Sequence, residues 1–158
     1  MKIVITGHTS GIGKYIYDHY NCIGLSRSTG FDIINNVITP HIDSETILIN
    51  NAWTSSDPWA QERILDQSLH AKKVICIGTN SQYAGVYKQS KDQLRSKCHD
   101  FFCKGYDVTY LALGKVDTPF SQNNHPDDLV INKQYIIQCI DFILLSAYRI
   151  EILSVRPD

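Results

Sequence analysis

Near its N-terminus the chain has an apolar run, Ile3-Val4-Ile5, that leads directly into Thr6-Gly7-His8-Thr9-Ser10-Gly11-Ile12-Gly13. The apolar run predicts a buried strand, and the pattern that begins at Gly11 predicts a helix. In a loop between the two, glycines allow a tight turn, a close approach of the backbone to a phosphate and close packing of the helix on the strand. The first amides of the helix would face that phosphate, with the positive end of the helix dipole behind them. This stretch therefore predicts a nucleotide-binding loop.

The composition is that of a globular chain with little net charge. The 158 residues are 43% hydrophobic and 20% charged, and the formal net charge is -1. This length predicts one domain, residues 1–158, with a hydrophobic core of its own. The charge gives no reason to expect a nucleic acid or an anionic membrane surface as a partner. The most apolar late segment, residues 136–148, is too short to span a bilayer.

The cysteines and histidines predict neither a disulfide framework nor a metal site. The five cysteines are odd in number, and Cys98 and Cys103 are too far apart for a CxxC pair. Three cysteines lie in apolar runs, where a free cysteine behaves as a small buried hydrophobe. The N-terminus does not read as a signal peptide, so the expected compartment is a reducing cytoplasm. The six histidines show no ligand spacing such as HExxH, so no metal is expected.

Apolar runs alternate with helical patterns along the chain. We expect strands at residues 2–6, 22–25, 46–50, 73–77, 107–113 and 150–155, and helices at 11–20, 58–71, 85–102 and 129–148. Such alternation predicts an α/β fold of three layers, a Rossmann-like doubly wound parallel sheet with helices on both faces. The region of strand three and helix three is reduced, with residues 31–33 as a minimal third strand. The polar stretch 121–128 is expected to be a loop where a lid over a cleft would lie.

The end of the second expected strand bears on which dinucleotide would bind. In folds of this kind the tip of that strand reads the adenosine ribose. An acidic residue there would favour NAD, whereas this chain has Arg27, whose guanidinium suits a 2′-phosphate. A solvated arginine at the end of a strand is the alternative interpretation. Arg27 therefore favours NADP(H) over NAD(H).

Tyr87 and Lys91 are the residues that best fit acid–base chemistry. They are four apart on an expected helix, so their side chains share one face. A phenol has an ordinary pKa of about 10, and a neighbouring ammonium would favour the phenolate and lower that pKa. Just upstream, at the carboxyl edge of the sheet, Thr79 and Ser81 offer hydroxyls to a substrate carbonyl oxygen. The alternative interpretation of Tyr87 and Lys91 is an exposed pair on a helix surface.

Four motifs, in this order, resemble those of the short-chain dehydrogenases/reductases across nearly the whole chain. Residues 6–13 resemble that family's TGxxxGIG cofactor loop, and Asn50-Asn51-Ala52 resembles its NNAG motif with Trp53 in place of glycine. Tyr87 and Lys91 fit its YxxxK motif, and residues 113–118 resemble its PG-x-V-x-T segment with leucine in place of proline. The resemblance implies an NAD(P)-dependent oxidoreductase that reduces a small carbonyl compound or oxidises an alcohol.

The resemblance also implies a role for individual residues. Tyr87 would be the general acid/base, and Lys91 would lower its pKa and bind the nicotinamide ribose. Thr79 would supply the catalytic hydroxyl, with Ser81 as the competing candidate. The remaining cofactor contacts would come from the loop residues Gly7, Thr9, Ser10, Gly11, Ile12 and Gly13, from Arg27 at the 2′-phosphate, from Asp32 and Ile33 at the adenine, from Asn51 and Ala52 between adenosine and ribose, and from Gly114, Val116 and Thr118 on the nicotinamide side.

The chain also departs from the family in ways that leave a second function open. It lacks most of strand three and helix three and the usual substrate-lid insertion. The family's helix-four asparagine, part of its proton relay, has no counterpart in residues 58–71. The alternative is thus a non-catalytic NADP-binding protein, such as a redox sensor or a partner-binding subunit. Formation of a homo-oligomer is also left open.

Overall fold

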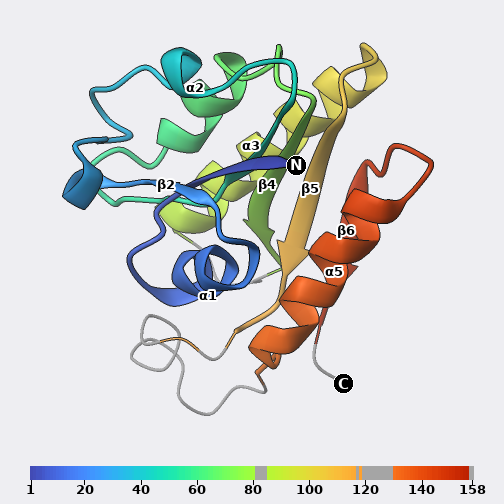
Figure 1. The fold of residues 1–158 in the computed structure, drawn as a ribbon. Coiled ribbons are helices and arrows are strands. Elements are labelled where there is room, and N and C mark those ends of the chain that lie inside the picture. Colours follow the sequence, from blue (N-terminus) through green and yellow to red (C-terminus); the bar gives the residue numbers. More distant parts are fainter. Residues whose placement is uncertain (81–84, 117, 119–129, 157–158) are drawn as a thin grey trace.

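Six parallel strands form one sheet in the computed structural model, which describes residues 1–80, 85–116, 118 and 130–156 (Figure 1). Their order in the sheet is β2-β1-β3-β4-β5-β6. The strands are β1 (Lys2–Thr6), β2 (Ile23–Leu25), β3 (Thr46–Asn50), β4 (Lys73–Thr79), β5 (Val108–Leu113) and β6 (Ile152–Val155). The helices are α1 (Gly11–Tyr20), α2 (Ala60–Asp66), α3 (Val86–Cys103) and α5 (Lys133–Leu145), with short 3-10 helices η1 (Arg27–Thr29) and η2 (Thr39–His41).

Helices cover both faces of the sheet, as Figure 1 shows. Successive side chains of a strand point to opposite faces, so each strand contributes to two cores. Ile47 and Ile49 of β3 pack with α1 and α5, while Leu48 packs with α2 and α3. Every residue of β3 and of β5 is buried, as expected for strands covered on both faces. The predicted three-layer, doubly wound parallel sheet is confirmed.

Several elements begin and end where the sequence predicts, and α2 does not. β1, α1 and β3 match their expected ranges, whereas the helix expected at 58–71 has only seven residues, Ala60–Asp66. After it, the Ser68 N–H bonds to the Leu65 carbonyl at 3.0 Å and the Ala71 N–H to the Ser68 carbonyl at 2.9 Å. These tight turns satisfy backbone groups that a continued helix would have used. The end of α2 was therefore predicted about one turn too late.

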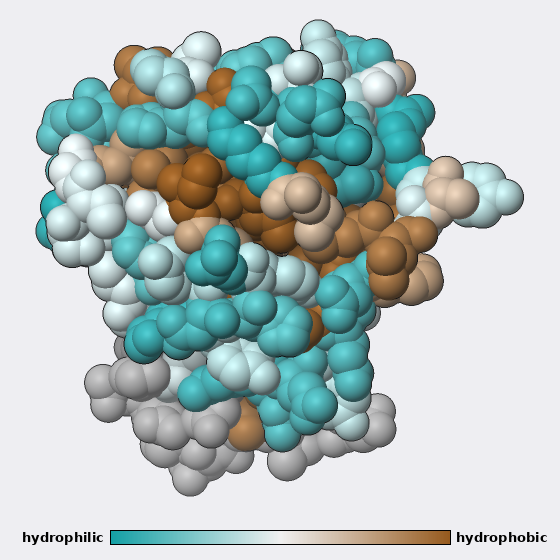
Figure 2. All heavy atoms as spheres, in the orientation of Figure 1, coloured by the Kyte–Doolittle hydropathy of each residue, from teal (hydrophilic) through white to brown (hydrophobic). Residues whose placement is uncertain are grey.

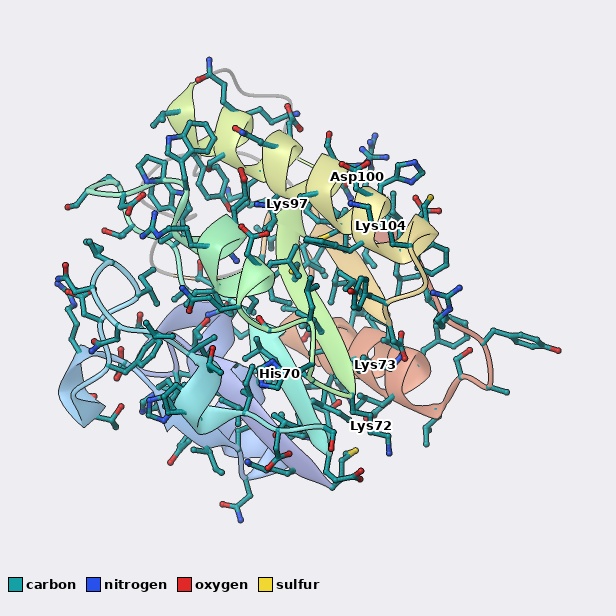
Figure 3. All side chains as sticks on the ribbon, turned by 90° about the horizontal axis from the view of Figure 1, so that it is seen from above. His70, Lys72, Lys73, Lys97, Asp100 and Lys104 are labelled. Atoms are coloured by element: carbon teal, nitrogen blue, oxygen red, sulfur yellow. The ribbon has the colours of Figure 1, made fainter. Side chains whose placement is uncertain are left out.

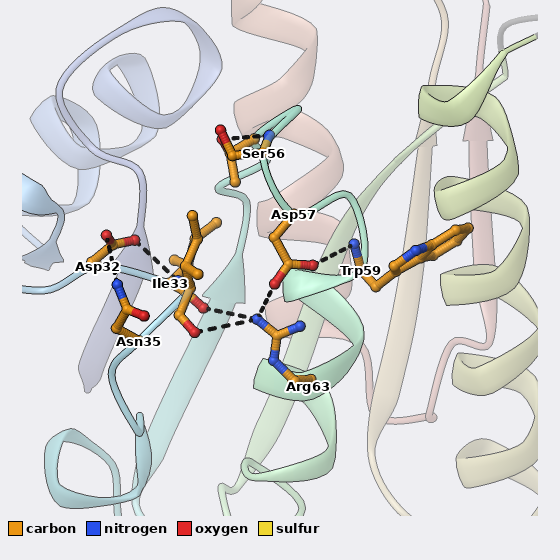
Figure 4. A network of polar contacts seen from close by, with 9 residues as sticks. Asp32, Ile33, Asn35, Ser56, Asp57, Trp59 and Arg63 are labelled. Carbon is orange, nitrogen blue, oxygen red and sulfur yellow. Dashed lines mark hydrogen bonds and ion pairs between the residues drawn. The ribbon is translucent and has the colours of Figure 1, made fainter.

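The third strand expected at residues 31–33 is wrong, because the backbone there forms local turns. The Asp32 carboxylate accepts the Ile34 N–H at 3.0 Å, and the Asp32 N–H bonds to the Asn36 side chain at 2.6 Å. Such local bonds compete with a strand ladder. Figure 4 shows how Arg63 of α2 holds this segment: its Nη2 donates to the Ile33 carbonyl at 3.5 Å and pairs with Asp57 at 2.5 Å. As a result β2 is the edge of the sheet.

Two expectations fall outside the described residues or at their border. The polar loop at 121–128 lies outside them, as does the first residue of the helix expected at 129–148. Of the described part of the expected helix, only α5 is helical, so the prediction was too long at both ends: Ile131 instead forms a bridge with Val116, and Asn132 and Ser146 cap the helix. The last expected strand is β6, which pairs in parallel with β5. Within the described ranges, no helix combines the length and the apolar character needed to cross a membrane.

Charged side chains gather where the strands of the sheet begin. Figure 3 labels His70, Lys72 and Lys73 near the start of β4, and Lys97, Asp100 and Lys104 along or just after α3. Lys73 pairs with Asp107 at 2.8 Å, and Lys97 pairs with Asp66 at 2.6 Å. The Lys73 side chain is buried, so solvent screens its pair less than the more exposed pair of Lys97 and Asp66, which contributes little to stability. The labelled charged side chains thus lie towards the amino ends of the strands, and the candidate site described below is at the carboxyl ends.

Hydrophobic atoms are exposed across the middle of the face in Figure 2, between the α2–α3 layer and α1. The exposed large hydrophobic residues of the chain include Ile23 on β2, Phe142 and Leu145 on α5, and Tyr148 after it. Large apolar side chains in contact with water favour association. A homo-oligomer, which stays a prediction, could bury some of these side chains.

Tyr110 of β5 fixes β4 to α3. An added Cβ at Gly78 would lie 2.0 Å from the Tyr110 ring, so only glycine leaves room for the ring there. The Tyr110 hydroxyl accepts the Thr79 N–H and donates to the Lys91 carbonyl, both at 3.1 Å. One buried phenol thereby joins the two elements that carry Thr79, Tyr87 and Lys91.

Replacing Tyr110 with Phe should lower the free energy of unfolding by about 1–3 kcal/mol, because the Thr79 N–H loses a buried acceptor. Urea denaturation measures the change. The matched control is Tyr148→Phe, at a phenol that is 82% exposed and whose removal should change stability by less than about 0.5 kcal/mol. Equal stability of the two variants would contradict the bridging role of Tyr110.

Candidate functional site

The glycine loop follows the carboxyl end of β1, and each of its three glycines meets a separate requirement. Gly7 and Gly11 have φ angles of 73° and 56°, in the left-handed region that favours glycine. Gly13 is different, because an added Cβ would lie 2.1 Å from the Gly7 carbonyl oxygen and 2.5 Å from Asn51 Nδ2. Two glycines thus permit the turn, and the third permits α1 to pack against the loop.

Thr6 and Asn51 join this loop to the end of β3. The Thr6 hydroxyl accepts the N–H groups of Asn51 and Ala52, both at 3.0 Å. Asn51 Nδ2 donates to the carbonyls of Thr6 at 3.1 Å and Gly7 at 3.3 Å. Asn51 and Ala52 therefore lie beside the loop, and the Asn51 amide holds the loop in place; their contact with the adenosine and ribose stays a prediction. Sequence reasoning missed Thr6, although a threonine that ends an apolar strand is a signal for such a contact.

The segment after β5 comes to the same edge of the sheet. Thr118 is buried, and its side chain would lie 3.9 Å from a Cβ added at Gly11. The Gly114 N–H bonds to the Val155 carbonyl at 2.7 Å, and Val116 forms a parallel bridge with Ile131. Gly114, Val116 and Thr118 thus connect the end of β5 with the glycine loop, and their contact with the nicotinamide side stays a prediction.

Tyr87 and Thr79 are brought together where β4 ends and α3 begins. The Tyr87 hydroxyl forms a hydrogen bond with the Thr79 side chain. Its ring packs edge-on against Trp53 with centroids 4.9 Å apart, and Trp53 Nε1 donates to Ser90 at 3.1 Å. Burial raises the pKa of Tyr87 to about 12, while the bond with Thr79 acts in the opposite direction. Of the two hydroxyl candidates, Thr79 thus contacts Tyr87, and Ser81 lies outside the described residues.

Lys91 shares the face of Tyr87, but its ammonium is directed into the protein. Its Nζ donates to Gln61 Oε1 at 2.5 Å and to the Ile77 carbonyl at 2.8 Å. It lies 5.4 Å from the centroid of the Tyr87 ring, over the ring itself. Burial lowers the pKa of Lys91 to about 7. The expectation that Lys91 lowers the Tyr87 pKa is therefore corrected: in this arrangement burial dominates and the Tyr87 pKa is raised.

Arg27 is exposed and follows β2, whose last residue contacts the glycine loop. The Gly7 N–H bonds to the carbonyl of Leu25, the last residue of β2, at 2.8 Å. η1 begins at Arg27 and is fixed by a capping box between Ser26 and Thr29. Within the described part of the chain, the Arg27 side chain makes no hydrogen bond or ion pair. Its guanidinium is thus exposed just after β2, and its contact with a 2′-phosphate stays a prediction.

The other predicted cofactor contacts fall into two groups. Thr9 and Ser10 are exposed at the start of α1, and the Ser10 side chain makes no capping bond there. Ile12 is partly buried against the core. Asp32 and Ile33, by contrast, are engaged in their own turn and in the contact with Arg63. The carboxylate of Asp32 therefore has a structural role, which the sequence did not indicate.

Gln61 of α2 is the contact that sequence reasoning missed. Its Nε2 donates to the carbonyls of Asn50 at 2.7 Å and Ile77 at 3.4 Å, and Asn50 Nδ2 donates to the Gln61 carbonyl at 2.8 Å. A signal for it existed, because Lys91 falls on the same helical stripe as Leu94 and Cys98. A lysine on a buried stripe requires hydrogen-bond acceptors on the element that packs against it.

Comparison with known proteins rests on structure alone. The sequence matches no model of a protein family and no curated protein at a significant level. Among solved structures, a short-chain dehydrogenase from Streptomyces avermitilis is similar with a TM-score of 0.78, 16% identity, and coverage of 99% of this chain and 88% of that one. The fold is that of the short-chain dehydrogenases/reductases.

Two further structures with the short-chain dehydrogenase/reductase fold were solved with cofactors. The 3-alpha-hydroxysteroid dehydrogenase from Pseudomonas sp. B-0831, complexed with NADH, is similar with a TM-score of 0.67, 15% identity, and coverage of 98% of this chain and 95% of that one. A short chain dehydrogenase from Burkholderia cenocepacia J2315, in complex with NADP, is similar with a TM-score of 0.70 and 14% identity. The match covers 98% of this chain and 90% of that one. Both forms of the dinucleotide thus occur among proteins of this fold.

Replacing Lys91 with Met should remove a pH-dependent part of the stability. The Lys91 pKa is about 7 in the folded chain and about 10.4 in an unfolded one. Between these pH values the unfolded state binds more protons, so Lys91 makes the free energy of unfolding rise with pH. The free energy of unfolding of the wild type, minus that of Lys91→Met, should therefore increase from about pH 7 towards pH 10. Urea denaturation at a series of pH values measures this difference. The exposed control Lys104→Met should give a flat difference, and a flat difference for Lys91→Met would contradict the prediction.

Proposed function

We propose that this chain is an NADP(H)-dependent oxidoreductase of the short-chain dehydrogenase/reductase type, acting on a small carbonyl compound or alcohol. The observation that carries the proposal is the hydrogen bond between the Tyr87 hydroxyl and Thr79. It lies at the carboxyl end of β4, at the edge of the parallel sheet where the glycine loop follows β1. Ligands of open α/β sheets bind at this edge.

The residues at this edge fit a dinucleotide. Among the described residues, a Cβ at Gly11 would meet only Thr118, at 3.9 Å and beyond. The hydroxyls of Thr9 and Ser10 are exposed beside the first amides of α1, a helix of ten residues. We propose that these groups bind the phosphates, with Asn51 and Ala52 beneath the loop. Gly114, Val116 and Thr118 would lie on the nicotinamide side, where the bound NADP(H) supplies or accepts the hydride.

The Tyr87 hydroxyl would hold and move the proton. With a pKa of about 12 the phenol is protonated at neutral pH, so it is ready to donate to a carbonyl oxygen. The Thr79 hydroxyl, bonded to the same phenol, would orient that oxygen. Donation to a carbonyl is the direction of reduction, and removal of the phenol proton for alcohol oxidation would require a higher pH. The chain is therefore expected to work best as a reductase near neutral pH.

One observation supports the alternative, a non-catalytic NADP-binding protein. The Lys91 ammonium contacts Gln61 and the Ile77 carbonyl, and both contacts are buried. A sensor or partner-binding subunit would need the glycine loop and Arg27 but no proton donor. Binding of NADPH without reduction of any carbonyl compound would favour this second function.

Replacing Tyr87 with Phe should reduce turnover by about 100-fold or more, because the proton donor is lost. NADPH binding should stay nearly intact, since the ring and its contact with Trp53 are retained. NADPH oxidation with a panel of small aldehydes and ketones measures turnover, and fluorescence titration measures binding. Tyr135→Phe, at an exposed phenol on α5, is the matched control. Unchanged turnover in Tyr87→Phe would overturn the proposed mechanism.

Replacing Arg27 with Asp should move the cofactor preference from NADPH towards NADH. The carboxylate would repel the 2′-phosphate and accept from ribose hydroxyls, so the ratio of the two affinities should change by on the order of tenfold or more. Titration with both dinucleotides gives the ratio. Arg95→Asp, at an exposed arginine of α3, makes the same charge change elsewhere. A ratio equal to that of the control would refute the role of Arg27.

A further inference from the structure

The ammonium of Lys91 lies in a region that offers it only neutral acceptors. Gln61 Oε1 and the Ile77 carbonyl accept from Nζ, and the side chain of Lys91 is buried at 3% exposure. No carboxylate in the described residues pairs with it. Glu62, the neighbour of Gln61 on α2, instead faces Lys97, with 3.6 Å between Glu62 Oε2 and Lys97 Nζ. A buried cation without a carboxylate depends strongly on each hydrogen bond it makes.

The titratable groups around Lys91 do not replace a carboxylate. They are Cys76 of β4, Cys98 and Tyr87 of α3, and Tyr110 of β5, whose hydroxyl donates to the Lys91 carbonyl and whose pKa burial raises. A hydrogen bond with Cys76, together with burial, raises the pKa of Cys98, and burial raises that of Tyr87. Cys98 and Tyr87 are therefore uncharged at neutral pH. Gln61 Oε1 and the Ile77 carbonyl are the hydrogen-bond acceptors of the ammonium, whereas negative charge on Cys76 or Cys98 would raise the pKa of Lys91.

The orientation of the Gln61 amide is determined by its neighbours. Its nitrogen donates to the Asn50 and Ile77 carbonyls, and its oxygen accepts from Lys91. A flipped amide would direct its nitrogen at an ammonium and its oxygen at two carbonyls, which is unfavourable at each contact. Asn50 also binds the Gln61 backbone carbonyl at 2.8 Å, so both ends of the residue are held by β3. The amide is thus a rigid acceptor directed at Nζ.

We propose that Gln61 is the positioning residue for Lys91: its side-chain amide, anchored on β3 and β4, holds the ammonium over the ring of Tyr87. The inference deepens the proposed function, because Tyr87 is the proposed proton donor. Its structural part, the dependence of Lys91 on Gln61, stands whether or not the chain turns over a substrate. Gln61 would act through Lys91 and would not contact the reacting atoms.

The test measures Lys91 itself. In protein labelled with carbon-13 on the lysine ε-carbon, the Lys91 signal is assigned by its loss in Lys91→Met and followed over pH by NMR. Gln61→Leu removes the acceptor, so the midpoint of the Lys91 titration should fall by about one unit or more. Gln61→Glu retains an oxygen at this place and should keep the midpoint at or above the wild-type value. In the proposed reaction, the pH dependence of kcat should shift with that midpoint.

The matched control is Gln67→Leu. Gln67 immediately follows α2, and its side chain accepts the Ile38 N–H at 3.0 Å, so it holds structure without touching Lys91. This variant should lose stability and leave the Lys91 midpoint where it is in wild type. If Gln61→Leu does not fold, the inference is tested with Gln61→Glu alone. A Lys91 titration midpoint below the wild-type value in Gln61→Glu would overturn it.

Two outcomes separate the inference from the proposed function. A Lys91 midpoint that is the same in Gln61→Leu and wild type would overturn the positioning role of Gln61, even if both proteins were active. A shifted midpoint in a chain that reduces no carbonyl compound would support the positioning role and count against the oxidoreductase. A shifted midpoint with an unchanged pH dependence of kcat would limit Gln61 to stability and overturn its link to the reaction.

Discussion

The close contact between Gly13 and the Gly7 carbonyl is the constraint on which the carboxyl edge of the sheet depends. A methyl group at Gly13 would lie 2.1 Å from that oxygen, so any side chain would push α1 away from the loop. The loop is held from its other side by Asn51 and Thr6, and Thr118 lies against Gly11. Three strand ends therefore meet around one short loop. A side chain at Gly13 would therefore displace the other segments that pack at that edge.

Much of this edge could be predicted because its signals are local. A group of closely spaced glycines, an apolar run or a tyrosine four residues before a lysine is visible in a short window of sequence. β1, α1 and β3 were placed correctly for that reason. The end of α2 was not, because the turn bonds of Ser68 and Ala71 replace helix bonds there. The turn at Asp32 was missed because it depends on Asn36 and Arg63, side chains outside the short apolar run.

The environment of Lys91 shows most clearly what a sequence pattern does not predict. The spacing from Tyr87 predicts a shared face, and the two residues do share it. Which way the ammonium turns depends on Gln61, which is 30 residues away in the chain and on another helix. The direction of the Tyr87 pKa shift follows from burial, which a sequence pattern expresses only indirectly. Contacts between elements thus decide the charges in the site, whereas patterns within elements decide its location.

The reduction of the segment after β2 has a consequence for association. Because residues 31–33 form no strand, the sheet ends at β2. This strand has three residues and is followed at once by η1. An edge strand normally presents a row of amide and carbonyl groups on which another chain can add a strand. Here that row is too short to hold a foreign strand in register, and Arg27 places a charge at its end. A shortened edge of this kind protects the folded chain against β-sheet aggregation on the side where a larger sheet would have continued.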